Sequence, residues 1–167
     1  MEPTKSKFEM SLENGPHHQL GKLCGSWEGT SRTWFEKDVL ADESPVQGTF
    51  TSILGGRFLL HQYQSSLQGK PLEGLAIIGY SFPYERYQTA WVDSFHMGTG
   101  IMFSEGDATP TGHAVIGSYG GGGMPEPWGW RTTIEVISDD QILITAYNIE
   151  PSGLEERATE INYHRLP

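Results

Sequence analysis

The stretch RFLLHQYQSSLQGKPLEGLAIIGYSFPYERYQTAWVDSF, residues 57–95, decides the fold. It contains three segments in which apolar and polar side chains alternate with a period of two, which is typical of β-strands with one buried face. The links between the segments, QGKP at 68–71 and FPYE at 82–85, are short and rich in turn-forming residues. Because short links favour antiparallel neighbours, this region predicts a β-meander.

The same pattern continues over most of the chain and predicts about ten strands. They cover residues 26–36, 46–54, 57–67, 72–82, 86–95, 99–105, 112–119, 128–137, 141–149 and 155–166. An open sheet of this size would leave two long edges unpaired, whereas a closed barrel has none. We therefore predict an all-β protein, an antiparallel meander of about ten strands closed into a barrel that is wide enough for an internal cavity.

Only the N-terminal region departs from the strand pattern. Residues 1–16 show no periodicity and predict a flexible lead-in, and residues 17–167 predict a single β-barrel domain. Within residues 16–24, Leu20, Leu23 and Cys24 follow a proline at helical spacing. This spacing predicts a short helix that ends at Gly25.

The composition limits the partners that we expect. Acidic residues outnumber Lys and Arg by 21 to 11, and the formal net charge of −10 repels nucleic acid and anionic membranes. The one cysteine, Cys24, excludes an intramolecular disulfide and a multi-cysteine metal site. No segment is apolar enough for a signal peptide or a membrane span, which favours a cytoplasmic protein.

Short sequence motifs resemble known families. Residues 25–29, GSWEG, follow the predicted helix and are similar to the GxW signature of calycin barrels, which include lipocalins and fatty-acid-binding proteins. Residues 20–165 resemble the bacterial family of uncharacterised proteins called domain of unknown function 1579. The resemblance rests on GSWEGTSRTW, LGGRFLLHQY, PLEGLAIIGY, WVDSFHMGTGIMFSEG and WRTTIEV, in this order. It implies a calycin-like barrel and no particular activity.

Trp27 is a candidate structural residue at one end of the barrel. It alternates with Gly29, Ser31, Thr33 and Phe35, so we expect all five to face inward. In calycins a basic side chain near the C-terminus packs on this tryptophan. The resemblance thus implies a cation–π contact from Arg165 or Arg157.

Charged side chains inside apolar segments mark candidate ligand contacts, because such a charge either faces solvent or meets a partner in a cavity. Glu73 shares a strand face with Leu75 and Ile77, Asp93 shares one with Trp91, and Glu105 shares one with Phe103. Both an exterior and an interior position stay open for these carboxylates. The predicted ligand-binding residues are His61, Tyr63, Glu73, Trp91, Asp93, Glu105, Trp130, Arg131 and Tyr147, with Tyr80, Met102 and Phe103 as further candidate walls.

The function favoured by these residues is the binding of a small, partly apolar molecule inside the barrel. One alternative is an enzyme that uses a carboxylate such as Asp93 or Glu105 in the same pocket, although no catalytic residue stands out. A distant likeness to the haem-binding nitrobindins offers a second alternative, in which His164 holds haem. A third is a filled barrel that serves as a structural or oligomerising module, for example a homodimer. The six histidines show no metal-ligand spacing, so we predict no metal and no cofactor.

Overall fold

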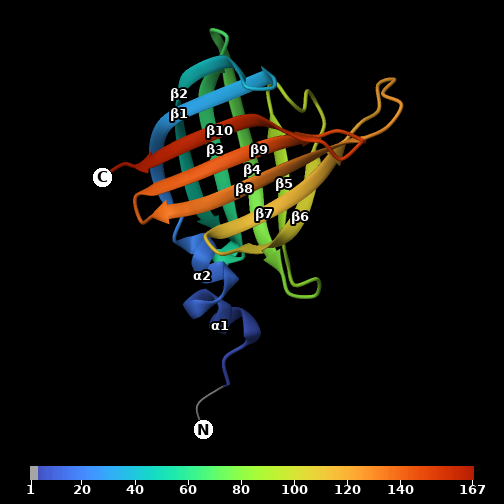
Figure 1. Ribbon diagram of the computed structural model, residues 1–167. Helices are drawn as coiled ribbons and strands as arrows, with labels where there is room; N and C mark the ends of the chain where they lie inside the picture. Colours follow the sequence, from blue (N-terminus) through green and yellow to red (C-terminus); the bar gives the residue numbers. More distant parts are fainter. Residues whose placement is uncertain (1–3) are drawn as a thin grey trace.

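The computed structural model describes residues 4–167, which form a closed barrel of ten antiparallel strands with two short helices at one end (Figure 1). Each strand pairs with its neighbour in the chain, and β1 pairs with β10 to close the barrel. The predicted all-β meander barrel is confirmed. The strands are β1 (Gly25–Glu36), β2 (Val39–Ile53), β3 (Phe58–Leu67), β4 (Lys70–Ser81), β5 (Arg86–Asp93), β6 (Met102–Thr109), β7 (Gly112–Tyr119), β8 (Trp128–Ser138), β9 (Gln141–Ile149) and β10 (Glu155–Arg165).

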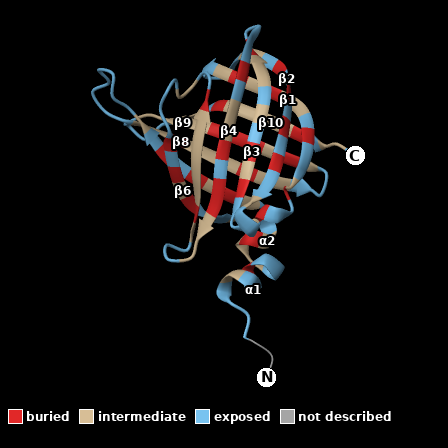
Figure 2. Cartoon of the chain, turned by 180° about the vertical axis from the view of Figure 1, so that it is seen from behind, coloured by how far each residue is buried: buried red, intermediate tan, exposed pale blue. Residues whose placement is uncertain are grey.

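Alternating burial along the strands produces one internal core, visible as alternating buried and exposed bands in Figure 2. In β2, for example, Val46 and Phe50 are buried while the residues between them on the other face meet solvent. Every second side chain of a strand points to the same face, so the period of two predicts this arrangement. The largest fully enclosed side chains are Trp27, Tyr163, Phe50, Leu59, Ile78, Ile142 and Val46.

Part of the predicted lead-in is helical. Helix α1 (Lys7–Asn14) begins at a capping box in which the Glu9 backbone N–H donates to the Ser6 side chain and the Ser6 backbone N–H donates to the Glu9 carboxylate. The sequence signal was Ser6 followed three residues later by Glu9. Residues 1–3 of the predicted lead-in lie outside the described residues.

Helix α2 (Pro16–Gly21) closes the end of the barrel from which β1 starts. Leu20 and Leu23 join the main core cluster. His17 is buried against the rings of Phe8, Tyr80 and Phe82. Burial, with a smaller contribution from the charge of Arg57, lowers the pKa of His17. No helix in residues 4–167 has the length and apolar character needed to span a bilayer.

Trp27 forms the centre of this closed end. Its side chain is 1% exposed, and its indole N–H donates to the Leu23 carbonyl over 2.9 Å. The Arg165 guanidinium lies 4.2 Å from the ring centroid and donates to the carbonyls of Lys22 and Cys24. The predicted cation–π contact is confirmed for Arg165. Arg157 packs on Trp34 instead.

Strands β2 and β6 differ most from their predicted bounds. Strand β2 begins at Val39 rather than residue 46, because the polar residues before Val46 pair with β1 in a long hairpin. A register shift at Thr33 and Trp34 turns the end of β1, so Phe35 is 52% exposed and does not face inward as expected. Strand β6 begins at Met102, three residues after the predicted start.

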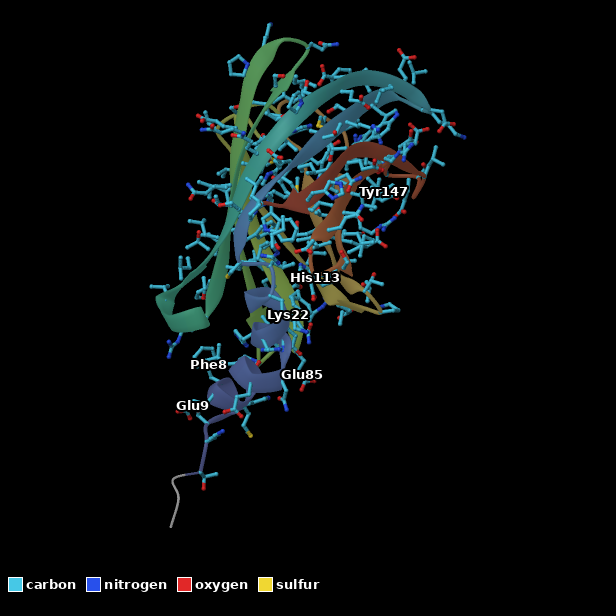
Figure 3. The ribbon with its side chains drawn as sticks, turned by 90° about the vertical axis from the view of Figure 1, so that its left-hand side faces the viewer. Phe8, Glu9, Lys22, Glu85, His113 and Tyr147 are labelled. Carbon is cyan, nitrogen blue, oxygen red and sulfur yellow. The ribbon has the colours of Figure 1, made fainter. Side chains whose placement is uncertain are left out.

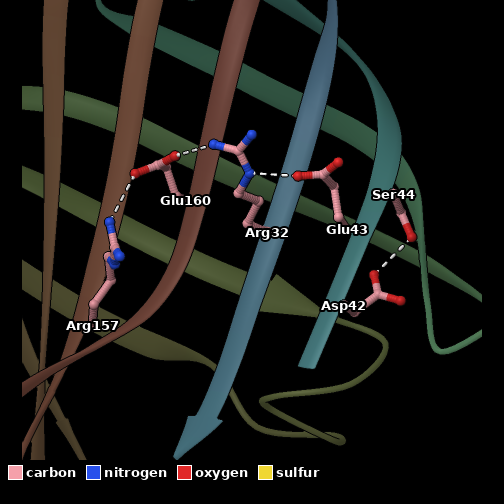
Figure 4. A network of polar contacts seen from close by, with 6 residues as sticks. All are labelled: Arg32, Asp42, Glu43, Ser44, Arg157 and Glu160. Atoms are coloured by element: carbon pink, nitrogen blue, oxygen red, sulfur yellow. Dashed lines mark hydrogen bonds and ion pairs between the residues drawn. The ribbon is translucent and has the colours of Figure 1, made fainter. Parts of the chain in front are cut away.

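The outer surface carries ion pairs between neighbouring strands. In Figure 4, Arg32 on β1 links Glu43 on β2 to Glu160 on β10, and Glu160 also binds Arg157. The pKa of Arg32 is raised, chiefly by its hydrogen bond to Glu43. Exposed pairs of this kind contribute little to stability, so the fold depends mainly on the interior.

Candidate functional site

The interior of the barrel contains a cavity of about 90 Å³, which we call the interior cavity. It lies between the helix-closed end and the opposite end of the barrel, which we call the mouth and which carries the links β1–β2, β3–β4, β5–β6, β7–β8 and β9–β10. Its walls combine apolar, hydroxyl and ring side chains from β3 to β10. The lining residues are His61, Tyr63, Ala76, Ile78, Thr89, Trp91, Ser104, His113, Val115, Trp130, Thr132, Ile134, Ile144, Ala146, Thr159 and Ile161.

His61 contributes a neutral imidazole to this wall. Its ring stacks on Phe50 with centroids 4.2 Å apart, and its Nε2 lies 3.1 Å from the Tyr163 hydroxyl. Burial lowers the pKa of His61 to about 3 and raises the pKa of Tyr163. Gly48 makes room for Tyr163, because a Cβ there would lie 2.2 Å from the hydroxyl. Both groups are therefore uncharged at pH 7.

His113 is the second buried imidazole of the cavity. It is 4% exposed and stacks on Tyr87 with centroids 4.3 Å apart. Figure 3 shows it toward the helix end of the barrel. Its ring also lines the interior cavity. Burial lowers the pKa of His113 to about 4, so this ring is also neutral at pH 7.

Two stacked tryptophans lie between the cavity and the mouth. The rings of Trp91 and Trp130 are 5.5 Å apart and nearly parallel, at 18°. The Trp91 indole N–H donates to the Tyr63 hydroxyl over 2.9 Å. The Tyr63 ring in turn covers Gly74, where a Cβ would lie 2.3 Å from that hydroxyl. The tryptophan pair therefore has one member fixed by a hydrogen bond and forms a flat apolar wall.

An aspartate and a histidine lie at the mouth beside this pair. The Asp93 side chain is fully buried, and its Oδ2 lies 2.5 Å from His96 Nδ1. Its Oδ1 accepts the backbone N–H groups of Phe95 and Met97, over 3.2 and 2.9 Å. Burial raises the pKa of Asp93, but its hydrogen bonds with His96 and with the two backbone N–H groups outweigh this effect, so the net pKa is lowered. Asp93 is therefore ionised.

The structure brings five of the nine predicted site residues to the interior or its mouth. His61, Tyr63, Trp91 and Trp130 line the cavity, and Asp93 lies at the mouth. His61 is 5% exposed, which confirms its predicted burial. Among the further candidate walls, Met102 is buried in a cluster with Trp130, Tyr80 packs against the main core cluster, and Phe103 is exposed.

The other four predicted site residues, Glu73, Glu105, Arg131 and Tyr147, lie on the outer face of the barrel. For the two carboxylates this is the exterior position that the sequence left open. Arg131 binds Glu155 over 2.6 Å and packs on the Tyr147 ring. Alternation shows which residues share a face but not which face points inward. The apolar neighbours that suggested an interior position are themselves exposed, as Ile77 (41%) and Phe103 (56%) show.

The sequence analysis did not select His96, His113, Ser104 or Thr132. His113 alternates with Val115 in β7, which was a usable signal for an inward position. His96 follows Asp93 by three residues in a loop, where no periodicity applies. Only the backbone path brings its ring onto Trp91 and Trp130.

The residues needed for a haem or metal site are not brought together. The nitrobindin-like alternative depended on His164, which is exposed on the outer face of β10 opposite Glu28 and does not reach the interior. Among the described residues, no three His, Cys, Asp or Glu side chains form a group that could hold a metal ion. The cavity volume is also far smaller than a site for a macrocycle.

Fold and site together define a closed ten-stranded antiparallel barrel with a small aromatic-walled interior cavity. The chain belongs to the family described as Protein of unknown function (DUF1579), whose model matches residues 13–165. This membership confirms the resemblance inferred from the sequence motifs.

Solved structures share the fold at low sequence identity. Rv2717c from M. tuberculosis is 16% identical with a TM-score of 0.64, over 91% of this chain and 98% of that chain. The S-type phycobiliprotein lyase CPES from Guillardia theta is 10% identical with a TM-score of 0.54, over 97% of this chain and 99% of that chain. At such identities the likeness shows the fold alone. No curated protein matched the sequence.

Proposed function

We propose that the protein binds a small, uncharged, partly apolar molecule in the interior cavity. The observation that carries this proposal is the interior cavity, whose walls join apolar and aromatic side chains to a few polar groups, among them the rings of His61 and His113. Ligand sites combine mostly apolar walls with a small number of polar groups that orient the ligand. A polar atom of the ligand near His113 would form a hydrogen bond there, and the apolar walls would hold the rest of the ligand.

The absence of charge among the cavity-lining residues favours an uncharged ligand. His61 and His113 are neutral at pH 7 because their pKa values are lowered to about 3 and about 4. Placing an ionised group among such walls without a counterion is strongly unfavourable. The hydroxyls of Ser104, Thr132 and Thr159 offer hydrogen bonds to a neutral ligand instead.

The cavity volume limits what enters without rearrangement. At about 90 Å³ it is smaller than the roughly 150 Å³ cavity that accepts benzene, and well below the ~300 to 1,000 Å³ of ordinary ligand sites. A ligand of two fused rings therefore requires Trp91 and Trp130 to separate. Their position beside the mouth makes them the boundary that opens.

The enzyme alternative has less support. Both oxygens of Asp93 are engaged, and Glu73 and Glu105 lie outside the barrel. No unengaged carboxylate from the predicted set faces the cavity.

A cytoplasmic location, a bacterial source and the oligomeric state stay predictions.

Isothermal titration calorimetry with 2-naphthol, a flat and mostly apolar probe, tests the proposed function. The informative pair is Ala146→Leu, which fills the cavity wall, and Ala90→Leu, which adds the same atoms on the outer face of β5. We expect Ala146→Leu to weaken the affinity for 2-naphthol at least about tenfold, because the leucine side chain occupies space that the ligand needs. Ala90→Leu should leave this affinity unchanged.

Native mass spectrometry of the purified protein provides an independent check, because a co-purified small molecule would appear as a bound mass.

In the calorimetry experiment, equal loss of affinity for 2-naphthol in both leucine variants, or no binding by the parent protein, would favour a filled structural barrel. Circular dichroism of each variant confirms that the barrel is folded before the affinities are compared.

A further inference from the structure

The chain after β5 is folded around the Asp93 carboxylate. One oxygen, Oδ1, accepts the backbone N–H groups of Phe95 and Met97, and the other, Oδ2, faces His96 Nδ1 at 2.5 Å. The Ser94 backbone N–H also bonds to the Glu73 carbonyl over 2.8 Å, which fixes the start of this turn to β4. The bonds of Asp93 and Ser94 therefore fix the loop that carries the His96 ring.

The partners of His96 determine where its proton lies. An ionised carboxylate only accepts hydrogen bonds, so Nδ1 carries the hydrogen that faces Asp93. In the neutral imidazole this leaves Nε2 as an acceptor with a free lone pair. No hydrogen bond joins Nε2 to any of residues 4–167, although the His96 side chain is only 18% exposed.

The surroundings of His96 point to a ligand contact. Its ring centroid is 5.6 Å from that of Trp91 and 5.5 Å from that of Trp130, the two rings that line the cavity. An acceptor held by a buried carboxylate thus lies at the edge of a flat apolar wall. Hydrogen bonds that involve an ionised partner are stronger than neutral ones, and Asp93 polarises the imidazole in this way.

We propose that His96 Nε2 accepts a hydrogen bond from an O–H or N–H group of the ligand, so that the ligand class is a flat, neutral, apolar molecule with a donor at its mouth-facing end. Asp93 is the positioning residue that selects the accepting form of His96. This inference rests on the proposed function. It excludes anionic ligands as the preferred class, because the ionised Asp93 and the net charge of −10 both oppose them.

Asp93→Asn gives a directional test of this arrangement. The amide oxygen of asparagine must occupy the place of Oδ1, where it accepts the two backbone N–H groups. The amide NH₂ then faces His96 Nδ1 and donates to it. The hydrogen of His96 moves to Nε2, and the ring becomes a donor at the ligand position.

The experiment compares two naphthalene probes by isothermal titration calorimetry. One is 2-naphthol, which carries a donor, and the other is 2-acetonaphthone, which carries only an acceptor. In the parent protein we expect naphthol to bind about tenfold more tightly than the ketone. In His96→Phe, which keeps the ring against Trp91 and Trp130, the affinity ratio should fall close to one. In Asp93→Asn the preference should reverse toward the ketone.

A matched control is His164→Phe, the same substitution on the outer face, which should keep the parent ratio. A ratio in His96→Phe equal to that of the parent would overturn the inference while leaving the proposed function intact, since both probes still bind. Failure of both probes to bind the parent protein would overturn the proposed function and this inference with it. If Asp93→Asn does not fold, the comparison of His96→Phe with His164→Phe decides alone.

Discussion

The two ends of the barrel use a tryptophan and a polar partner in different ways. At the closed end Trp27 donates to a backbone carbonyl and lies under Arg165, whose guanidinium donors reach the carbonyls of Lys22, Cys24 and Asp139. At the mouth Trp91 and Trp130 lie beside His96, whose Nε2 has no partner in the described chain.

This difference indicates that the closed end stabilises the fold, whereas the mouth is the end at which a ligand enters and leaves. The closed end has its polar groups bonded to backbone of several segments, so opening it would break many contacts at once. The mouth depends on ring packing and on one carboxylate that holds a short loop. Ligand-binding loops are commonly regions of low local stability, and the loop at the mouth, held by few bonds, is such a region.

The largest expected effect concerns the closed end. Trp27→Ala should lower the free energy of unfolding by ~3 to 5 kcal/mol, because it leaves a large cavity in a packed core. Urea denaturation measures this loss. The control is Trp34→Ala on the same strand, whose half-buried ring should contribute only about 1 kcal/mol. Equal losses would show that the closed end has no special role.

The second effect is a loss of stability in acid. His61 and His113 have folded-state pKa values of about 3 and about 4, below the value near 6.5 of an unfolded chain. The folded state thus binds fewer protons, so the stability from keeping these rings neutral is present above pH ~6.5 and is lost as pH falls toward the folded values. At pH 5 we expect a loss of about 2 kcal/mol per histidine.

The variant His113→Phe isolates one of these contributions. Phenylalanine keeps the stacking on Tyr87 but cannot take up a proton, so the difference in stability between pH 7 and pH 5 should shrink by about 2 kcal/mol. The exposed His164→Phe should show the full parent difference. An unchanged pH dependence in His113→Phe would mean that this ring does not remain neutral in the fold.

The third and smallest effect is the loss of stability when an arginine that covers a tryptophan is replaced, and it is compared for two such arginines. Arg165→Met removes bonds to three carbonyls as well as the contact with Trp27, and we expect a loss of ~1 to 3 kcal/mol in urea denaturation. Arg157→Met removes a surface ion pair and the contact with Trp34, worth less than about 1 kcal/mol. The reverse order would contradict the assignment of the closed end.

The sequence predicted the fold better than the site for a physical reason. Period-two alternation and short turns are local signals, and they identified ten strands and the meander. The role of Trp27 was also predictable, since the GxW motif marks the strand start and the C-terminal Arg165 completes the contact. The helix α1 was missed although its Ser6 and Glu9 capping box is visible in the chain.

The errors at the site arise from properties that alternation does not contain. Glu73 and Glu105 share faces with apolar residues, but the outer surface of this barrel also carries apolar side chains such as Ile77 and Phe103. The hydrophobic pattern therefore left the direction of these faces open. His96 lies in a loop, and its contact with both tryptophans depends on how Asp93 bends the backbone.

The most direct test of the central claim, that the interior between the tryptophan pair and His113 is the ligand site, is a crystal structure with 6-bromo-2-naphthol. Anomalous scattering distinguishes the bromine of the ligand from the carbon, nitrogen and oxygen atoms around it. We predict a single strong peak inside the barrel, with Trp91 and Trp130 moved apart. The outer face of strands β1 to β5 also carries a hollow, lined among others by Gln47 and Gln62. A bromine peak confined to that hollow would contradict the account.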